Sequence, residues 1–181
     1  MEGQPESHPT VWTVGHSTRP IAEFIELLQS AAITVLGDVR RFPGSRRYPQ
    51  YNQPPLEEAL AAADIRYLAF PNLGGRRQPR PDSPHTAWRN PSFRAYADYM
   101  DTDAFRQGIE QVVALAATER IALMCSEAVW WRCHRALIAD YLKAHGYPII
   151  HLLSPTKHEP HPYTSAAQIV NGVLTYTAPA T

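Results

Sequence analysis

Residues 122–142, ALMCSEAVWWRCHRALIADYL, contain two cysteines, a glutamate, a histidine and two arginines between an apolar run and a helical pattern. An apolar run ends at Cys125, and a helical pattern is expected to begin near Arg132. A helix N-terminus and neighbouring cations lower the pKa of a thiol, so a thiolate nucleophile is chemically reasonable here. The segment offers Cys125 as candidate nucleophile, Glu127 and His134 as candidate proton carriers, and Cys133 and Arg135 as candidate substrate-binding residues.

Three other interpretations of these thiols stay open. A cysteine phosphatase or rhodanese loop fits poorly, because phosphatases place five residues between Cys and Arg whereas six separate Cys125 from Arg132. A zinc site would need distant ligands, because Cys133 and His134 diverge by about 100° on a helix and no CxxC or HxxxH spacing occurs. Finally, both cysteines could be small buried hydrophobic residues, with His134 capping the helix.

A second cluster, GHST, follows an apolar run near the N-terminus. Gly15 permits a tight turn, and Ser17 or Thr18 can cap a helix that begins near Pro20. His16 would then lie beside outward-pointing backbone N–H groups, an arrangement that suits an anion. Turn glycines and capping hydroxyls also open many helices that bind nothing. We therefore expect His16 as a proton carrier, with Gly15 and Ser17 binding substrate.

A third cluster lies in ITVLGDVRRFPGSRRY, where a period of two puts Asp38 and Arg40 on the same side of a strand. The two residues could form a structural ion pair. Alternatively, Arg40 binds an anionic substrate while Asp38 orients it or acts as a base. Ser45 follows in a proline-rich loop and is a further substrate-binding candidate.

A fourth cluster, LGGRRQPR, contains adjacent glycines followed by arginines. Gly74 and Gly75 would let backbone amides approach a phosphate closely, and Arg76 would supply charge. Neither GxxxxGK[ST] nor GxGxxG occurs, so the fingerprints of common nucleotide-binding folds are absent and no cofactor is predicted.

The elements that position these clusters are apolar runs alternating with helical patterns. Strands are expected over 10–14, 33–39, 65–70, 120–125 and 148–153, and amphipathic helices over 21–28, 105–116 and 137–142. The fold class is therefore α/β, a Rossmann-like three-layer sandwich with a mostly parallel central sheet. Each cluster follows a strand, and the carboxyl ends of parallel strands share one edge, where ligands bind.

Residues 1–181 are expected to form a single α/β domain, with residues 1–9 flexible and 154–181 forming a C-terminal extension. Asn171-Gly172 in that extension favours a hairpin over a short helix followed by a strand. Nine of the 17 prolines fall within 43–91, which predicts long loops at the strand C-terminal edge.

Composition limits the partners. The formal net charge is zero, so the whole molecule has no general attraction for nucleic acid or anionic membranes. Eight arginines against three acidic residues between Val39 and Arg80 nevertheless create a local positive excess. No apolar run of membrane-spanning length and no hydrophobic leader is evident, so a cytoplasmic location is expected.

The set TVGHST, DVRRFPGSRRY, LGG and MCSEAVWWRCHR, followed by an apolar helix and IIHLL, resembles the prokaryotic domain-of-unknown-function family 488 over about residues 11–153. The resemblance implies a single cytoplasmic α/β domain without an assigned reaction. Its signature residues correspond to Gly15, His16, Ser17, Asp38, Arg40, Pro43, Ser45, Leu73, Gly74, Gly75, Cys125, Glu127, Cys133, His134 and Arg135.

Two functions fit these observations. The first is an enzyme acting on a phosphorylated or otherwise anionic substrate, such as a nucleotide or a nucleic acid end, at the strand edge. The second is a non-catalytic nucleic-acid or nucleotide binding module, in which Arg-rich loops bind phosphates while Tyr48, Tyr51 and Trp131 stack on bases. A purely structural role for the polar clusters is the third interpretation.

Overall fold

The computed structural model describes residues 7–178, so most of the segment expected to be flexible (1–9) and the end of the C-terminal extension lie outside the described residues. A six-stranded sheet forms the middle layer, in the order β3-β2-β4-β1-β5-β6. The first five strands are parallel, and β6 pairs antiparallel with β5 at one edge. The strands are β1 (Val11–Gly15), β2 (Val35–Asp38), β3 (Arg66–Ala69), β4 (Ile121–Cys125), β5 (Ile149–Ser154) and β6 (Lys157–Pro160). The α/β class and the mostly parallel sheet are confirmed.

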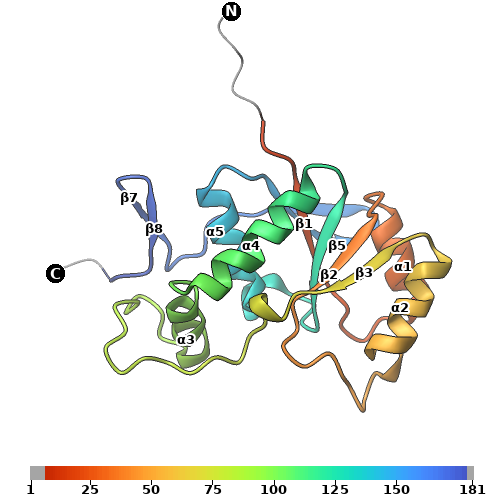
Figure 1. Ribbon diagram of the computed structural model, residues 1–181, viewed down its shortest axis with the longest axis horizontal. Helices are drawn as coiled ribbons and strands as arrows, with labels where there is room; N and C mark the ends of the chain where they lie inside the picture. The colour runs from red at the N-terminus through yellow and green to blue at the C-terminus, as the bar shows by residue number, and fades with distance from the viewer. Residues whose placement is uncertain (1–6, 179–181) are drawn as a thin grey trace, which may run out of the picture.

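Helices cover both faces of this sheet (Figure 1). Apolar residues of α1 and α2 pack on one face, and those of α3, α4 and α5 pack on the other. The helices are α1 (Ile21–Gln29), α2 (Gln53–Ala62), α3 (Pro91–Tyr99), α4 (Asp103–Ala116) and α5 (Arg135–Ala144), with short 3-10 turns η1 (Pro49–Tyr51), η2 (Pro71–Leu73) and η3 (Trp130–Arg132). None of the helices between residues 7 and 178 is both long and apolar enough to cross a membrane.

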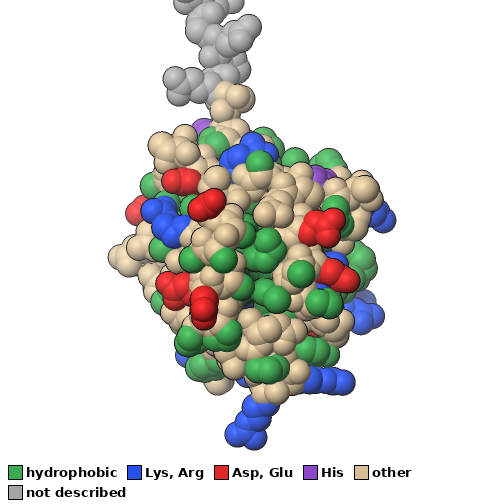
Figure 2. Space-filling model, turned by 90° about the vertical axis from the view of Figure 1, so that its right-hand side faces the viewer, with side chains coloured by type: hydrophobic (Ala, Val, Ile, Leu, Met, Phe, Trp, Pro, Cys, Tyr) green, Lys and Arg blue, Asp and Glu red, His purple; other side chains and the backbone are tan. Residues whose placement is uncertain are grey.

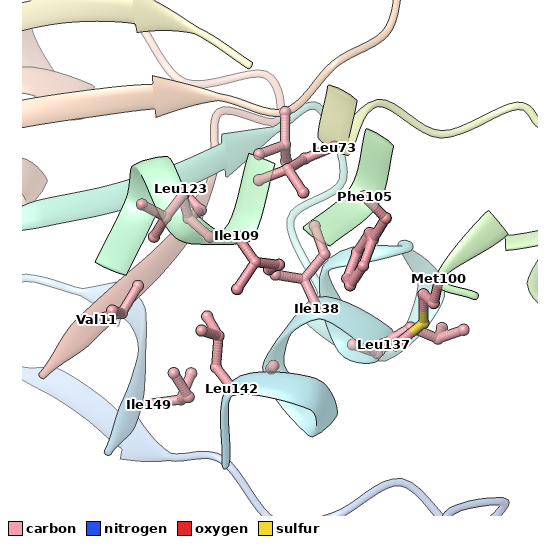
Figure 3. Close-up of a cluster of buried hydrophobic side chains, with 14 of the residues drawn as sticks. Val11, Leu73, Met100, Phe105, Ile109, Leu123, Leu137, Ile138, Leu142 and Ile149 are labelled. Atoms are coloured by element: carbon pink, nitrogen blue, oxygen red, sulfur yellow. The ribbon is translucent and has the colours of Figure 1, made fainter. Parts of the chain in front are cut away.

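Successive side chains of a strand point to opposite faces of the sheet, so the strands contribute to the hydrophobic cores on both faces. Trp12 and Val14 of β1 face α1 and α2, whereas Val11 faces the other layer. On that other side, Figure 3 shows side chains of the sheet meeting Ile109 of α4 and Ile138 of α5. This packing holds α5, which follows the cysteine-containing loop, directly against the strands.

Neighbouring strands β1 and β4 are followed by helices on opposite faces, because α1 packs in one layer and α5 in the other. In an open parallel sheet such a reversal leaves a crevice at the carboxyl ends of the two strands. The chain enters β1 from the top of Figure 1, and the long loops after β2 and β3 run along its lower part. In Figure 2, which views the side formed by α1 and α2, acidic side chains lie on both sides of a hydrophobic centre, and Lys and Arg side chains project at the lower end.

Two helices and one strand were not anticipated. The segments that form α2 and α3 fall in the proline-rich stretch, yet each helix has proline in its first turn, where the missing N–H costs nothing. Asn90 also caps α3 by accepting a hydrogen bond from the Ser92 N–H. The short, exposed edge strand β6 contains too few apolar residues to give the hydrophobic pattern that predicts a strand.

The helix expected from near Arg132 begins at Arg135 instead, because residues 130–132 form η3 and Cys133 is extended (φ −132°, ψ 151°). Cys133 therefore precedes the helix rather than occupying its first turn. The predicted hairpin is confirmed as β7 (Gln168–Val170) and β8 (Val173–Thr175). Asn171 and Gly172 connect them with φ values of 51° and 77°, as a type I′ turn requires.

Candidate active site

A cavity of about 590 Å³ lies at the carboxyl ends of the strands, and its walls come from the loops after β1, β2, β3 and β4 and from α3. Most of the site candidates named from the sequence line it. These are His16, Ser17, Arg40, Ser45, Gly75, Arg76, Cys125, Glu127, Cys133 and His134. Gly15, Asp38, Gly74 and Arg135 do not line it and lie in the structure that supports its walls.

Asp38 and Arg40 form a buried ion pair. The guanidinium donates from Nε and Nη2 to the carboxylate, at 3.0 Å and 2.8 Å, and the side chains are 1% and 8% exposed. Tyr67 also donates to this carboxylate at 2.6 Å. Burial of the phenol, and to a smaller extent this hydrogen bond, raises the pKa of Tyr67. Because Arg40 lines the cavity while Asp38 does not, the pair holds one guanidinium rigidly in the cavity wall.

His16 is a buried imidazole with one nitrogen committed and one without a partner. Nδ1 lies 2.8 Å from the Ser17 carbonyl and donates to it, which leaves a lone pair on Nε2. Nε2 has no hydrogen-bond partner within the described residues, although the residue is only 2% exposed. Burial, assisted by the charge of Arg40, lowers the pKa of His16 to about 4, so the ring is neutral at pH 7. A neutral imidazole with a vacant lone pair beside a cavity can accept a hydrogen bond from a bound group.

The His16 ring stacks on Tyr51, with 4.1 Å between the ring centroids. Tyr51 is fully buried and its hydroxyl donates to the Arg19 carbonyl. The expectation that Tyr51 stacks on a bound base is therefore wrong, because this face of its ring is taken by the histidine. The residue positions His16 instead.

Gly15 and Arg135 shape the loop that carries Glu127. A side chain at Gly15 would have its Cβ only 1.7 Å from the Glu127 carbonyl oxygen, so only glycine leaves room for this main chain. Nη2 of Arg135 donates to the same carbonyl at 2.7 Å. The Glu127 main chain is thus held from two sides while its carboxylate, the one acidic group among the described residues of the cavity lining, stays exposed.

Arg135 is 2% exposed and makes no ion pair with a carboxylate in the part of the chain that the structure describes. Its Nε has no hydrogen-bond partner there either. Burying an unpaired guanidinium costs several kcal/mol, so a negative charge nearby is expected. The backbone N–H of Arg135 donates to the sulfur of Cys133 at 3.4 Å, which makes that sulfur the candidate counter-charge.

The two sulfur atoms lie 2.7 Å apart, with Cys125 at the end of β4 and Cys133 just before α5. Burial by itself raises a thiol pKa, but the hydrogen bond from Cys125 and the charge of Arg135 outweigh it and lower the pKa of Cys133 to about 7. Burial and the adjacent Cys133 raise the pKa of Cys125 well above its usual value. Cys133 is therefore favoured as the thiolate of the pair, because its sulfur also accepts the Arg135 N–H, whereas the sequence had singled out Cys125 as the candidate nucleophile.

His134 completes this side of the cavity. Its Nε2 donates to the Val39 carbonyl at 2.9 Å, and its Nδ1 faces the Cys133 sulfur at 3.5 Å. Burial lowers the pKa of His134, so the ring is neutral near pH 7. A Cβ at Gly75 would lie 3.0 Å from Nδ1, which explains the small residue at this position of the wall.

Three further arginines line the cavity without an acidic partner among the described residues, namely Arg41, Arg76 and Arg132. Phe42 lies beside the first two and is 62% exposed, with the guanidinium carbons 5.4 Å and 5.9 Å from its ring centroid. Arg41 and Phe42 were not named as site residues from the sequence. The sequence places both residues in the arginine-rich stretch but gives no other indication of a role. Hydrophobic periodicity does not show which side chains of a loop face a cavity.

The fold and the site together define a doubly wound α/β protein with a positively charged cavity at the reversal of strand order. The chain belongs to the family described as "Domain of unknown function DUF488", whose model matches residues 20–142. The match is narrower than the resemblance first expected and leaves out the loop around His16. Neither the curated proteins nor the solved structures contained a match. Within residues 7–178, no group of three or more His, Cys, Asp or Glu side chains is arranged to hold a metal ion.

Proposed function

We propose that the chain is an enzyme acting on a phosphorylated or otherwise anionic substrate held in the strand-edge cavity. The observation that carries this proposal is the charge of the lining. Arg41, Arg76 and Arg132 contribute guanidinium groups with no acidic partner among the described residues, whereas Glu127 alone contributes a carboxylate. Guanidinium groups bind phosphate and carboxylate in bidentate fashion, so such a cavity concentrates anions.

Reactive groups share the same cavity, which favours an enzyme over a passive anion site. Cys133 supplies a thiolate near neutral pH, balanced by the buried charge of Arg135. His16 supplies a vacant nitrogen that can accept a proton, and the exposed carboxyl group of Glu127 can carry one. Binding charge at the arginines would place the substrate beside both the nucleophile and the base.

A second candidate function is nucleotide or nucleic-acid binding without catalysis, and Phe42 is the observation that favours it. An aromatic ring that is 62% exposed and flanked by two guanidinium groups is suited to stack on a base whose phosphate the arginines bind. Trp131 is 52% exposed but does not line the cavity, so Phe42 and Tyr48 are the better stacking candidates.

The test is turnover on a panel of nucleoside monophosphates, diphosphates and 5′-phosphorylated oligonucleotides, followed by chromatography and phosphorus NMR. We expect conversion of at least one compound, reduced about 10-fold or more by Arg76→Gln because a charge-assisted contact to the substrate is lost. Arg89→Gln, an exposed arginine outside the cavity lining, is the matched control and should leave the rate unchanged.

Three results would count against the enzyme. One is equal turnover in Arg76→Gln, Arg89→Gln and the unmodified chain. Another is a fully folded Glu127→Gln or His16→Gln variant whose turnover is undiminished. The third is binding of the panel compounds without conversion, with affinity falling steeply between low and moderate salt, which would establish the second candidate instead.

A further inference from the structure

The cavity holds the chain's only two cysteines in direct sulfur–sulfur contact. Cys125 is fixed by the parallel register of β4 with β1, in which it pairs with Gly15. Cys133 is fixed by the N–H of Arg135 and by η3, whose carbonyl at Trp130 accepts from the Cys133 N–H. Neither thiol therefore has to travel to meet the other.

The two thiols are also unequal, as reversible thiol oxidation requires. One sulfur should be a thiolate that attacks an oxidant, and the other a nearby thiol that resolves the product. The sulfur of Cys133 lies 2.7 Å from that of Cys125, accepts a hydrogen bond from the Arg135 N–H and is subject to the charge of the buried Arg135 guanidinium. Among the described residues, no such N–H donor lies beside the Cys125 sulfur, whose S–H instead donates to the Glu127 carbonyl at 3.9 Å. Both line the cavity, so a molecule as small as a peroxide can reach them although they are only 3% and 6% exposed.

We propose that Cys125 and Cys133 form a peroxide-oxidisable dithiol, a site of reversible disulfide modification inside the cavity. The Cys133 thiolate attacks one oxygen of hydrogen peroxide, the O–O bond breaks, and the leaving hydroxide takes up a proton to become water. The Cys125 sulfur then attacks the sulfenic sulfur of Cys133, and the sulfenic hydroxyl leaves as a second water with the Cys125 proton. Overall, two thiols and one peroxide yield one disulfide and two waters, and a small-molecule dithiol reverses the change.

The consequence for catalysis rests on the proposed function, whereas the disulfide itself does not. A disulfide removes the Cys133 thiolate and leaves the buried Arg135 without its counter-charge. An enzyme that uses this thiolate would lose turnover on oxidation and regain it on reduction. The site would then be active only while the pair is reduced.

The test begins with the full-length chain, reduced, freed of reductant and treated with an equivalent of hydrogen peroxide. Thiols left free are then blocked with N-ethylmaleimide under denaturing conditions. We expect the intact mass to fall by two hydrogen atoms, no maleimide uptake, and a peptide map that links Cys125 to Cys133. Dithiothreitol before blocking should restore uptake of two maleimides.

Single-cysteine variants test the assigned roles with the sulfenic-acid probe dimedone. In Cys125→Ser the resolving thiol is missing, so Cys133 should retain its sulfenic acid and become labelled. In Cys133→Ser, labelling of Cys125 should be about 10-fold slower, because its higher thiol pKa leaves less thiolate and nucleophilicity offsets only part of that loss. Circular dichroism of both variants checks that they are folded.

The inference fails if native protein resists peroxide while the denatured chain oxidises, if the product is a sulfinic acid or an intermolecular dimer, or if both variants label at the same rate. Failure of the proposed function looks different. In that case the intramolecular disulfide forms and reverses as described, while the nucleotide panel shows no turnover in either redox state.

Discussion

The buried guanidinium of Arg135 and the thiolate of Cys133, which precedes it in the chain, compensate each other's charge. Arg135 is almost inaccessible and lacks a carboxylate partner in the described chain, a situation that is costly unless another anion compensates it. Cys133 can be that anion because its thiol loses a proton near pH 7, whereas the alcohol of a serine would not. The ionisation of the Cys133 thiol is therefore tied to the buried guanidinium of Arg135.

This pairing predicts how the thiol reacts with pH. The rate of Cys133 alkylation by iodoacetamide should rise through about pH 7, because only the thiolate is nucleophilic. Replacing Arg135 with Gln should move the rise to higher pH by removing the compensating charge, and Arg135→Lys should retain most of the original profile. Arg89→Gln, at an exposed position outside the cavity lining, is the control and should change little. An unchanged profile in a folded Arg135→Gln variant would contradict the pairing.

At the scale of elements, the turn after β1 and the loop after β4 are built as one unit. The N–H groups of His16 and Ser17 donate to the carbonyls of Cys125 and Ser126, both at 3.0 Å, which extends the β1–β4 pairing beyond the strands. Gly15 lies at the centre of this unit, against the Glu127 carbonyl. His16 and Cys125 therefore share a single backbone scaffold.

Gly15→Ala tests that scaffold. Its Cβ would lie 1.7 Å from a backbone oxygen that cannot rotate away, so the loop must shift. We expect a loss of about 1–3 kcal/mol in the free energy of unfolding, measured by urea denaturation. Gly44→Ala is the matched control, because the nearest atom to its Cβ is the Asn52 side-chain oxygen at 4.0 Å, and its stability should change by no more than about 0.5 kcal/mol. Equal stabilities for the two variants would mean that the loop is free to adjust.

Sequence reasoning found the elements whose signals are local and missed those that depend on context. Apolar runs mark β1 to β5 because parallel strands are buried on both faces. Helix α2 was hidden by Pro54 and Pro55, which disfavour a helix interior but suit its first turn. In the site, strand ends indicated which segments could meet, since topology brings such ends to one edge. Which of the two cysteines is favoured as the thiolate could not be seen, because a thiol pKa depends on hydrogen bonds and on a buried charge.

At the scale of the whole molecule, a buried polar network ties the C-terminal extension to the sheet. Asp140 of α5 accepts hydrogen bonds from the Nε2 of His161 at 2.8 Å and from the hydroxyl of Tyr176, also at 2.8 Å. The other nitrogen of His161 bonds to His151 on β5, whose ring stacks on Trp130 beside the cysteine loop. The extension thus contributes to the support of the loop that carries the site.

Tyr176→Phe should reveal how much this network contributes. The change removes a donor from a buried carboxylate, so the free energy of unfolding should fall by about 1–3 kcal/mol. Tyr163→Phe is the control, because that ring is 37% exposed and no hydrogen bond of its hydroxyl occurs among the described residues; its effect should be within about 0.5 kcal/mol of zero. Urea denaturation of both variants makes the comparison, and equal midpoints would show that Asp140 does not need this donor.

Three histidines held as neutral rings, namely His16, His134 and His151, make the stability of the molecule sensitive to acid. Burial lowers the pKa of His16 to about 4 and that of His151 to about 2, against 6.5 for an exposed histidine. The unfolded chain therefore binds more protons than the folded one below about pH 6.5. The stability that these rings contribute is complete above that pH and is lost as the pH falls toward the folded values.

Urea unfolding between pH 7.5 and pH 5.5, where exposed carboxyl groups stay ionised, should show the free energy of unfolding decreasing with acid. Each ring adds a slope that approaches about 1.4 kcal/mol per pH unit once the unfolded histidine is fully protonated. His16→Gln should remove one such contribution and flatten the dependence, whereas His158→Gln, at an exposed position, should leave it unchanged. If the stability of the unmodified chain does not depend on pH, none of these rings is held neutral in the folded state. The proposal that His16 accepts a proton in the cavity would then be contradicted.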